Sequence, residues 1–83
     1  RFFETDEKVL ETYTIPVGSP VAKKKIMDVD CGKHCVIVSI ERDGVSITPK
    51  GDTVIKEGDE VVVLVSQRRF SRDIEKLEQM IKG

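Results

Sequence analysis

The residues of this sequence with the clearest capacity for chemistry lie in one short stretch, Asp30 to Cys35. The stretch contains both cysteines of the chain, Cys31 and Cys35, and the sole histidine, His34. Thiolate, imidazole and carboxylate groups are the ligands that Zn²⁺ prefers, and a structural zinc site needs four of them, usually as two pairs. Because no second pair of cysteine or histidine residues follows, we predict that the protein holds no metal.

The same stretch could instead hold a cysteine nucleophile with a histidine base. Such a pair needs its two side chains within hydrogen-bonding reach and a third group that orients the base. His34 and Cys35 are neighbours in sequence, and neighbouring side chains on a strand point to opposite faces. We therefore predict that His34 is a surface residue and that Cys35 starts a buried strand. Nothing else in the chain offers a usable acid–base pair, so we predict that the protein is not an enzyme.

Phosphate-binding loops are absent from the sequence. A Walker loop needs Gly-x4-Gly-Lys-Ser/Thr and a dinucleotide-binding fold needs Gly-x-Gly-x-x-Gly, and neither occurs. Basic residues cluster at Lys23–Lys25 and at Arg68, Arg69 and Arg72. The lysines could attract phosphate groups of a ligand or an anionic lipid, or they could form a solvated surface, since lipid-binding clusters usually contain more charges. The arginines could bind carboxylates or phosphates, or pair with glutamates of the segment that follows.

Composition narrows the classes of function. Charged residues make up 35% of the 83-residue chain, yet its net charge is −1, and nucleic-acid binding usually needs a basic excess. Aromatic residues make up 5%, too few for base-stacking platforms. No apolar run approaches the roughly 18 residues that cross a bilayer, and two cysteines imply no disulfide framework, which favours a reducing cytosol. A chain of this size forms one small domain whose limited core favours dimerisation or a neighbouring domain.

The elements that must position these residues follow from the hydrophobic pattern. Residues 1–8 are predicted to be a linker or the tail of an upstream element, and Val9–Val17 alternates as a strand. Ser19 and Pro20 predict the start of a helix, because serine can cap it and proline suits its first position. This helix is expected to end near Gly32. Its apolar face would consist of Ala22, Ile26 and Val29.

The second half of the chain predicts three strands and a helix. Cys35–Ile40 and Val45–Thr48 are expected to form a hairpin through the Asp-Gly turn of Glu41–Gly44. The β-branched run Val61–Val65 predicts a central strand that is buried on both faces. Phe70–Lys82 has apolar residues at helical spacing and predicts an amphipathic helix. The predicted fold class is therefore α+β, a small, mostly antiparallel sheet with two helices in the order strand, helix, strand, strand, strand, helix.

Four sequence patterns between Val9 and Ser66 resemble the TrkA C-terminal domain family, also called the C-terminal half of the RCK domain (regulator of potassium conductance). They are Gly-Ser-Pro at residues 18–20 before a helix, Ile-x-Arg-x-Gly at residues 40–44, Ile-x-Pro followed by Gly-Asp at residues 47–52, and Gly-Asp at residues 58–59 before the last strand. The resemblance implies that residues 9–83 form a TrkA-C-like regulatory domain.

In that family, such domains lie on the cytosolic side of the membrane, pair into dimers and build a ring with a nucleotide-binding N-terminal half. The resemblance therefore implies a regulatory or assembly domain of a potassium uptake channel or transporter, peripheral to the inner face of the membrane. The alternatives are the regulatory domain of another transporter, namely a chloride channel, an antiporter or a dicarboxylate carrier, and a ligand-free dimerisation module. A nucleic-acid partner is not expected.

The resemblance also implies a ligand. Some family members bind cyclic di-AMP at the two-fold dimer interface, with apolar residues against the adenines and an arginine beside the phosphates. Carried over by strand position, Val36 and Ile37 would line the pocket and Arg42 would lie beside it. Thr48 stands where the binding members tend to have an amide side chain. The alternative interpretation of these residues is a core strand followed by an exposed turn arginine, and no other cofactor is implied.

Overall fold

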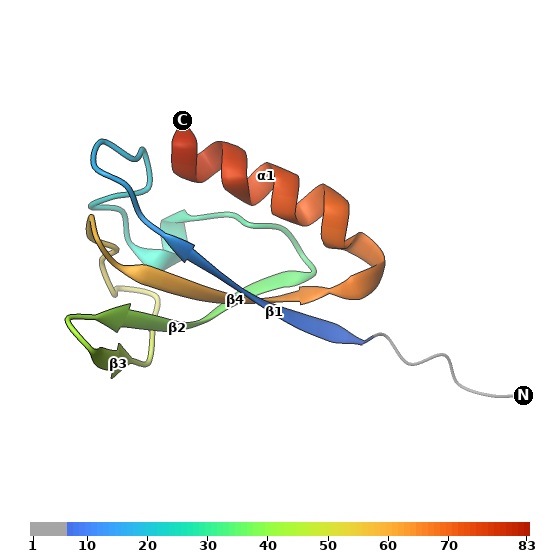
Figure 1. Cartoon of the computed structure of the whole chain (residues 1–83), viewed down its shortest axis with the longest axis horizontal. Coiled ribbons are helices and arrows are strands. Elements are labelled where there is room, and N and C mark those ends of the chain that lie inside the picture. Colours follow the sequence, from blue (N-terminus) through green and yellow to red (C-terminus); the bar gives the residue numbers. More distant parts are fainter. Residues whose placement is uncertain (1–6) are drawn as a thin grey trace, which may run out of the picture.

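The computed structural model describes residues 7–83, with the side chains of residues 69–71 excepted, as a four-stranded sheet with one α-helix across one face (Figure 1). The elements in chain order are β1 (Lys8–Thr14), the 3₁₀ helix η1 (Ile26–Asp28), β2 (Cys35–Arg42), β3 (Val45–Ile47), β4 (Glu60–Ser66), the 3₁₀ helix η2 (Gln67–Arg69) and α1 (Phe70–Lys82). The strands are ordered β1-β4-β2-β3 in the sheet, and all neighbours are antiparallel. This confirms the predicted α+β class and the central place of β4.

The core lies between the sheet and α1. Alternate residues of β4 point toward the helix because side chains along a strand alternate between its two faces. Val61, Val63 and Val65 are buried there and belong to the same apolar cluster as Ile74 and Leu77 of α1. A valine, leucine or isoleucine side chain that is fully buried contributes about 1.5–3 kcal/mol. The apolar residues whose spacing predicted an amphipathic helix over residues 70–82 are therefore those that α1 packs against the sheet.

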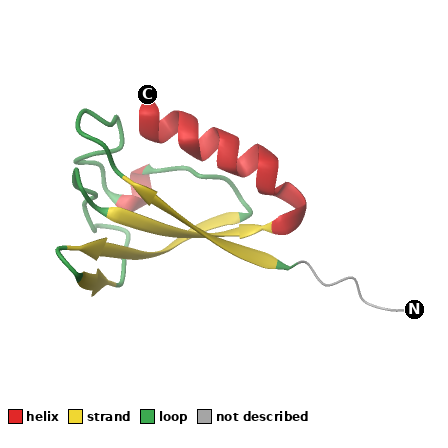
Figure 2. Cartoon of the chain, viewed as in Figure 1, coloured by secondary structure: helices red, strands yellow, loops and turns green. Residues whose placement is uncertain are grey.

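The opposite face of the sheet is open, and here the prediction for β4 was wrong. Val62 and Leu64 on that face are only half-buried. Leu64 pairs with Leu10 of β1 on one side and with Val36 of β2 on the other, and both partners are more than half exposed. The uniformly apolar sequence of β4 predicted cover on both faces. The structure covers only one face, because α1 and the segment between β1 and β2 pack on the same side of the sheet, as Figure 2 also shows. No described element covers the other face.

The predicted helix over residues 19–30 does not form. Turns and the short η1 replace it, because the backbone of this segment pairs with residues 53–55. Lys23 has a φ of +74°, and its N–H donates to the carbonyl oxygen of Ile55 at 2.7 Å. The N–H of Ile55 donates in turn to the carbonyl of Lys24 at 2.9 Å, and Lys25 and Val54 form an isolated β-bridge. These bonds exclude a continuous α-helix, since that requires φ near −60° at each residue.

Ser19 nevertheless acts at the position where a cap was predicted. Its Oγ accepts a hydrogen bond from the N–H of Val21 at 3.3 Å and donates one to the carbonyl of Ile81 at 2.6 Å. The second bond ties the turn after β1 to the last turn of α1. The serine therefore satisfies backbone groups of two segments that are far apart in sequence.

The β2–β3 hairpin forms as predicted. Asp43 and Gly44 have φ values of +54° and +77°, as a two-residue type I′ turn requires. A β-bulge interrupts the pairing of β2 with β4 between Ile37 and Ser39. The predicted linker over residues 1–8 overlaps the start of β1 at Lys8, and Phe2 and Phe3, at its other end, lie outside the described residues.

Candidate functional site

The four residues that the family resemblance places at a ligand site lie on different surfaces. Val36 pairs with Leu64 on the open face of the sheet and is 55% exposed. Ile37 pairs with Val63 on the opposite face and packs against the core. Thr48 is exposed and follows β3, whose last residue pairs with Ile40. Thr48 thus lies along the middle of β2, whereas Arg42 is at the end of that strand.

Arg42 is bound within its own chain. Its Nε donates to Oδ1 of Asp59 at 2.8 Å, and its Nη2 donates to Oδ2 of Asp59 at 2.7 Å and to the carbonyl oxygen of Val54 at 2.9 Å. This two-pronged geometry is the strongest form of an arginine–carboxylate pair. The arginine therefore joins the end of β2 to the loop that leads into β4. Its side chain keeps 25% of its surface exposed.

Asp59 is the partner that the sequence patterns did not reveal as such. It is 1% exposed, and it accepts a third hydrogen bond from the N–H of Lys56 at 2.8 Å. The hydrogen bonds from the Arg42 guanidinium hold the pKa of this carboxyl below its usual range, although burial opposes the shift. The Gly-Asp pair at residues 58–59 is one of the four family patterns in the sequence, but its ion pair with Arg42 depends on the fold.

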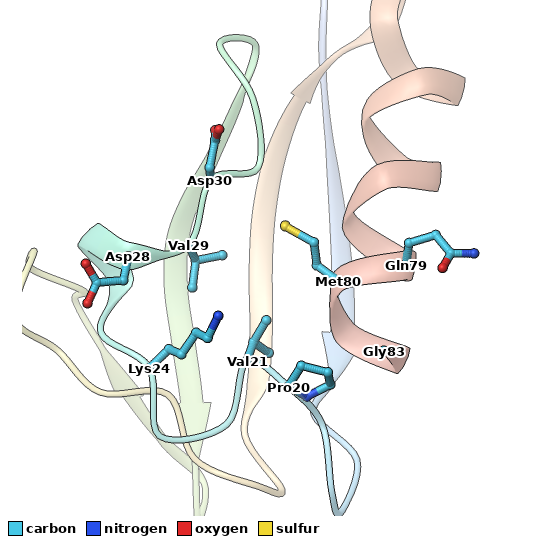
Figure 3. Close-up of a pocket in the computed structure, with 9 residues that line it drawn as sticks. All are labelled: Pro20, Val21, Lys24, Asp28, Val29, Asp30, Gln79, Met80 and Gly83. Atoms are coloured by element: carbon cyan, nitrogen blue, oxygen red, sulfur yellow. The ribbon is translucent and has the colours of Figure 1, made fainter.

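A first pocket, of about 200 Å³, lies between the turns after β1 and the C-terminal end of α1 (Figure 3). Figure 3 shows the side chain of Val29 and the sulfur of Met80 pointing toward each other across it. Pockets that hold drug-sized ligands measure about 300–1,000 Å³, so this one is too small for a dinucleotide. The residues that line it are Pro20, Val21, Lys24, Asp28, Val29, Asp30, Gln79, Met80 and Gly83.

A second pocket, of about 570 Å³, lies between the loop before β2 and the first half of α1. Its lining carries more positive than negative charge and includes Arg72, one of the arginines that the sequence singled out. Asp73 lies in its wall, 5% exposed, and Oδ2 of this residue is buried without a hydrogen-bond partner among the described residues. The lining residues are Asp30, Gly32, Lys33, His34, Arg72, Asp73 and Lys76.

The two cysteines are sequence neighbours of residues that line this second pocket. Both are free and buried, and the thiol of Cys31 donates to the carbonyl oxygen of Cys35 at 3.0 Å. His34 is exposed as predicted. The described residues contain no group of three or more histidine, cysteine, aspartate or glutamate side chains that could hold a metal ion. The metal-free state of the whole domain stays a prediction.

Residues 10–78 match the family model of the TrkA-C domain. The chain belongs to the TrkA C-terminal domain family. A curated relative, the Trk system potassium uptake protein TrkA of Azorhizobium caulinodans, is 33% identical over 64 residues. That match covers 77% of the present chain and 13% of the relative's length. The resemblance inferred from the four sequence patterns is thereby confirmed.

Two solved structures share the fold of this TrkA-C domain. One is described as an RCK domain with cda; it superposes with a TM-score of 0.70 at 22% identity and covers 93% of this chain and 99% of its own. The other is described as an RCK_C domain dimer of S. agalactiae BusR in complex with c-di-AMP, with a TM-score of 0.67, 21% identity and coverage of 87% and 93%. Within residues 7–83, no helix of this TrkA-C domain has the length and apolar character needed to cross a bilayer.

Proposed function

We propose that this TrkA-C domain is a cytosolic regulatory part of a potassium uptake channel or transporter. The similarity to a Trk system potassium uptake protein over 77% of the chain supports this proposal. The domain would work without catalysis. It would pair with a second copy, or join a ring with a nucleotide-binding N-terminal domain, and transmit the binding of a small anionic ligand to a membrane subunit. A nucleic-acid partner is not part of the proposal.

The open face of the sheet is the surface that we assign to pairing. Leu10, Leu64 and Val36 form one continuous row across three strands, and Val38 beside them is also exposed. A contiguous exposed apolar patch of this kind marks an interaction surface on a small soluble domain. The side chains of Phe2, Phe3 and Phe70 lie outside the described residues.

Cyclic di-AMP is the ligand that we propose, because one solved relative is described in complex with it. Val36 would offer an apolar contact to a base at the pairing surface, with Ile37 behind it in the sheet. Arg42 and Thr48 stay proposed contacts, and the exposed part of the Arg42 guanidinium would have to reach a phosphate while Asp59 holds its Nε and Nη2. A site of this kind would be completed by the second copy.

Sedimentation and calorimetry test both parts of the proposal. The wild-type domain should sediment as a dimer or larger, and cyclic di-AMP should release or absorb heat on binding. Val36→Lys places a charge in the centre of the open face and should give a monomer that does not bind. The matched control is Val17→Lys, since Val17 is 87% exposed in a turn outside the sheet.

A wild-type protein that is monomeric at micromolar concentration would contradict the proposed pairing surface. A dimer that gives no heat with cyclic di-AMP would contradict the proposed ligand and support the pairing. The second result favours a ligand-free dimerisation module.

The transporter itself is identified from the neighbouring coding sequence. An adjoining domain with Gly-x-Gly-x-x-Gly would support a role in potassium uptake. Adjoining membrane spans of a chloride channel, an antiporter or a dicarboxylate carrier would instead support regulation of that transporter.

A further inference from the structure

The loop before β2 brings the thiol of Cys31 into contact with Cys35, the other cysteine of the chain. Cys31 lies in this loop and Cys35 is the first residue of the strand, and the two are 6% and 5% exposed. The pKa of the Cys31 thiol is lowered, above all by a hydrogen bond from the Cys35 thiol, and the same bond raises the pKa of Cys35. Burial and the carboxylates of Asp30 and Asp73 act against the charge on Cys31. The hydrogen bond from the Cys31 thiol to the carbonyl oxygen of Cys35 places the Cys31 sulfur directly against Cys35.

The sulfur of Cys31 lies close to the backbone of Cys35. The sulfur of Cys31 is 3.0 Å from the carbonyl oxygen of Cys35. That oxygen lies about 2.4 Å from the α-carbon of the same residue, so the sulfur is at most about 5.4 Å from that α-carbon. A disulfide would require the Cys31 sulfur to leave this carbonyl oxygen and turn toward the sulfur of Cys35, with the two α-carbons about 4.4–6.8 Å apart. Gly32, at a φ of +106°, gives the loop a turn that favours glycine.

The second pocket lies beside the loop that carries Cys31 and is the space from which a small oxidant would approach. The pocket is lined by residues that flank both cysteines, namely Asp30 and Gly32 around Cys31 and His34 before Cys35. Its volume of about 570 Å³ is far larger than a peroxide molecule requires. Lys33, Arg72 and Lys76 at the rim offset the charge of the two aspartates. Access of the oxidant to the Cys31 sulfur would require the loop to open, since Cys31 is 6% exposed.

We infer that Cys31 and Cys35 form a reversible intramolecular disulfide and that this loop is a redox modification site. The oxidant is hydrogen peroxide. The Cys31 thiolate attacks the O–O bond, which breaks, and forms a sulfenic acid while the leaving hydroxide takes up a proton to become water. The sulfur of Cys35 then attacks the sulfur of Cys31, and its proton leaves with the displaced hydroxide as a second water. The two thiols lose two electrons in total, peroxide is reduced to two waters, and a dithiol reverses the reaction.

The oxidation state of this pair would change the contacts between the loop and the first turns of α1. Asp73 lies directly beside the loop, since a Cβ on Gly32 would be 3.6 Å from its Oδ1. Lys76 in the next turn is 4.0 Å from Oδ2 of Asp30. A loop drawn toward β2 by a covalent bond would therefore change the contacts of α1 and the shape of the second pocket. Disulfides in cytosolic proteins are usually of this transient, sensing type.

Peptide mapping tests the inference with the intact chain. Trypsin cleaves after Lys33, between the two cysteines, so a disulfide would link the peptides of residues 26–33 and 34–42. The protein is treated with hydrogen peroxide, unfolded in iodoacetamide and digested. Met27 is 63% exposed and lies in the first of these peptides, so its oxidation to sulfoxide reports that the oxidant was active. We expect the linked pair to replace the two alkylated peptides and dithiothreitol to restore them.

Three results would overturn the inference. They are an oxidised Met27 with both cysteines still alkylated, cysteines converted singly to sulfinic acid, and a disulfide between two chains seen on a non-reducing gel. The variants Cys31→Ser and Cys35→Ser must lose the linked pair. The wild-type result decides the question by itself if either variant fails to fold. Circular dichroism of the α1 signal before and after oxidation then measures how far the change reaches.

Discussion

Two buried aspartates at opposite ends of the sheet are held in opposite ways. Asp59 accepts three hydrogen bonds, two of them from the guanidinium of Arg42. Asp73 has a carboxylate oxygen that is buried without a partner among the described residues. A buried charge is costly unless it is paired and hydrogen-bonded. The burial of Asp59 is therefore compensated by its hydrogen bonds and joins two parts of the fold, whereas part of the free-energy cost of burying Asp73 stays uncompensated beside the second pocket.

The largest expected effect is the loss of Asp59. Asp59→Ala leaves the Arg42 guanidinium without its carboxylate and frees the N–H of Lys56, so we expect the free energy of unfolding to fall by about 3 kcal/mol. Urea unfolding followed by circular dichroism measures this, since the chain has no tryptophan. Asp52→Ala, a change at an exposed aspartate in the loop before β4, is the control. An equal loss of unfolding free energy in the two variants would show that the ion pair with Arg42 contributes nothing beyond what an exposed aspartate contributes.

A milder change separates the charge of Arg42 from its geometry. Arg42→Lys keeps the positive charge but cannot donate two parallel hydrogen bonds. We expect a loss of about 1–2 kcal/mol, smaller than that of Arg42→Ala, which strands the buried carboxylate. Thermal and urea unfolding of both variants provide the measurement. The same proteins sharpen the ligand test, because a variant that is folded and no longer binds cyclic di-AMP assigns Arg42 to the ligand rather than to the fold alone.

The pH dependence of stability should follow Asp59. Its pKa in the folded protein lies below the ordinary value of 3.8, so the folded state favours the ionised form. The stabilisation is therefore fully present above pH 3.8 and is lost as the pH falls below it toward the lowered pKa. The difference in unfolding free energy between wild type and Asp59→Asn should be constant near neutrality and shrink in acid. A difference that grows on acidification would contradict the assignment.

The smallest effect is expected at Asp73. Asp73→Asn keeps the shape of the side chain and removes a buried charge that lacks one partner, while it gives up a favourable position in the first turn of α1 worth about 0.3–1 kcal/mol. The two contributions oppose each other, and we expect the stability to change by less than about 1 kcal/mol. Urea unfolding beside Asp59→Asn gives the direct comparison. A loss as large as that of Asp59→Asn would mean that Asp73 is compensated as fully as Asp59.

Much of the fold could be predicted because it rests on patterns between near neighbours in sequence. The Asp43–Gly44 pair specified the hairpin through the φ values that its turn requires. The 3.6-residue spacing of Ile74, Leu77 and Ile81 indicated α1, and the β-branched run indicated β4. In each case the deciding interactions lie within one element or one turn. The candidate site was less accessible, since Val36 and Ile37 were expected to line one pocket and the pleat of β2 places them on opposite faces.

The sequence by itself determined the three strands after residue 34, the helix α1 and the membership of the family, because these depend on residue types and spacings along the chain. Only the tertiary structure decided that residues 19–30 pair with residues 53–55 instead of forming a helix, that Arg42 binds Asp59, and that Cys31 touches Cys35. Hydrogen bonds between distant segments outweigh helix propensities of less than about 1 kcal/mol per residue. Such bonds depend on which segments the sheet brings together.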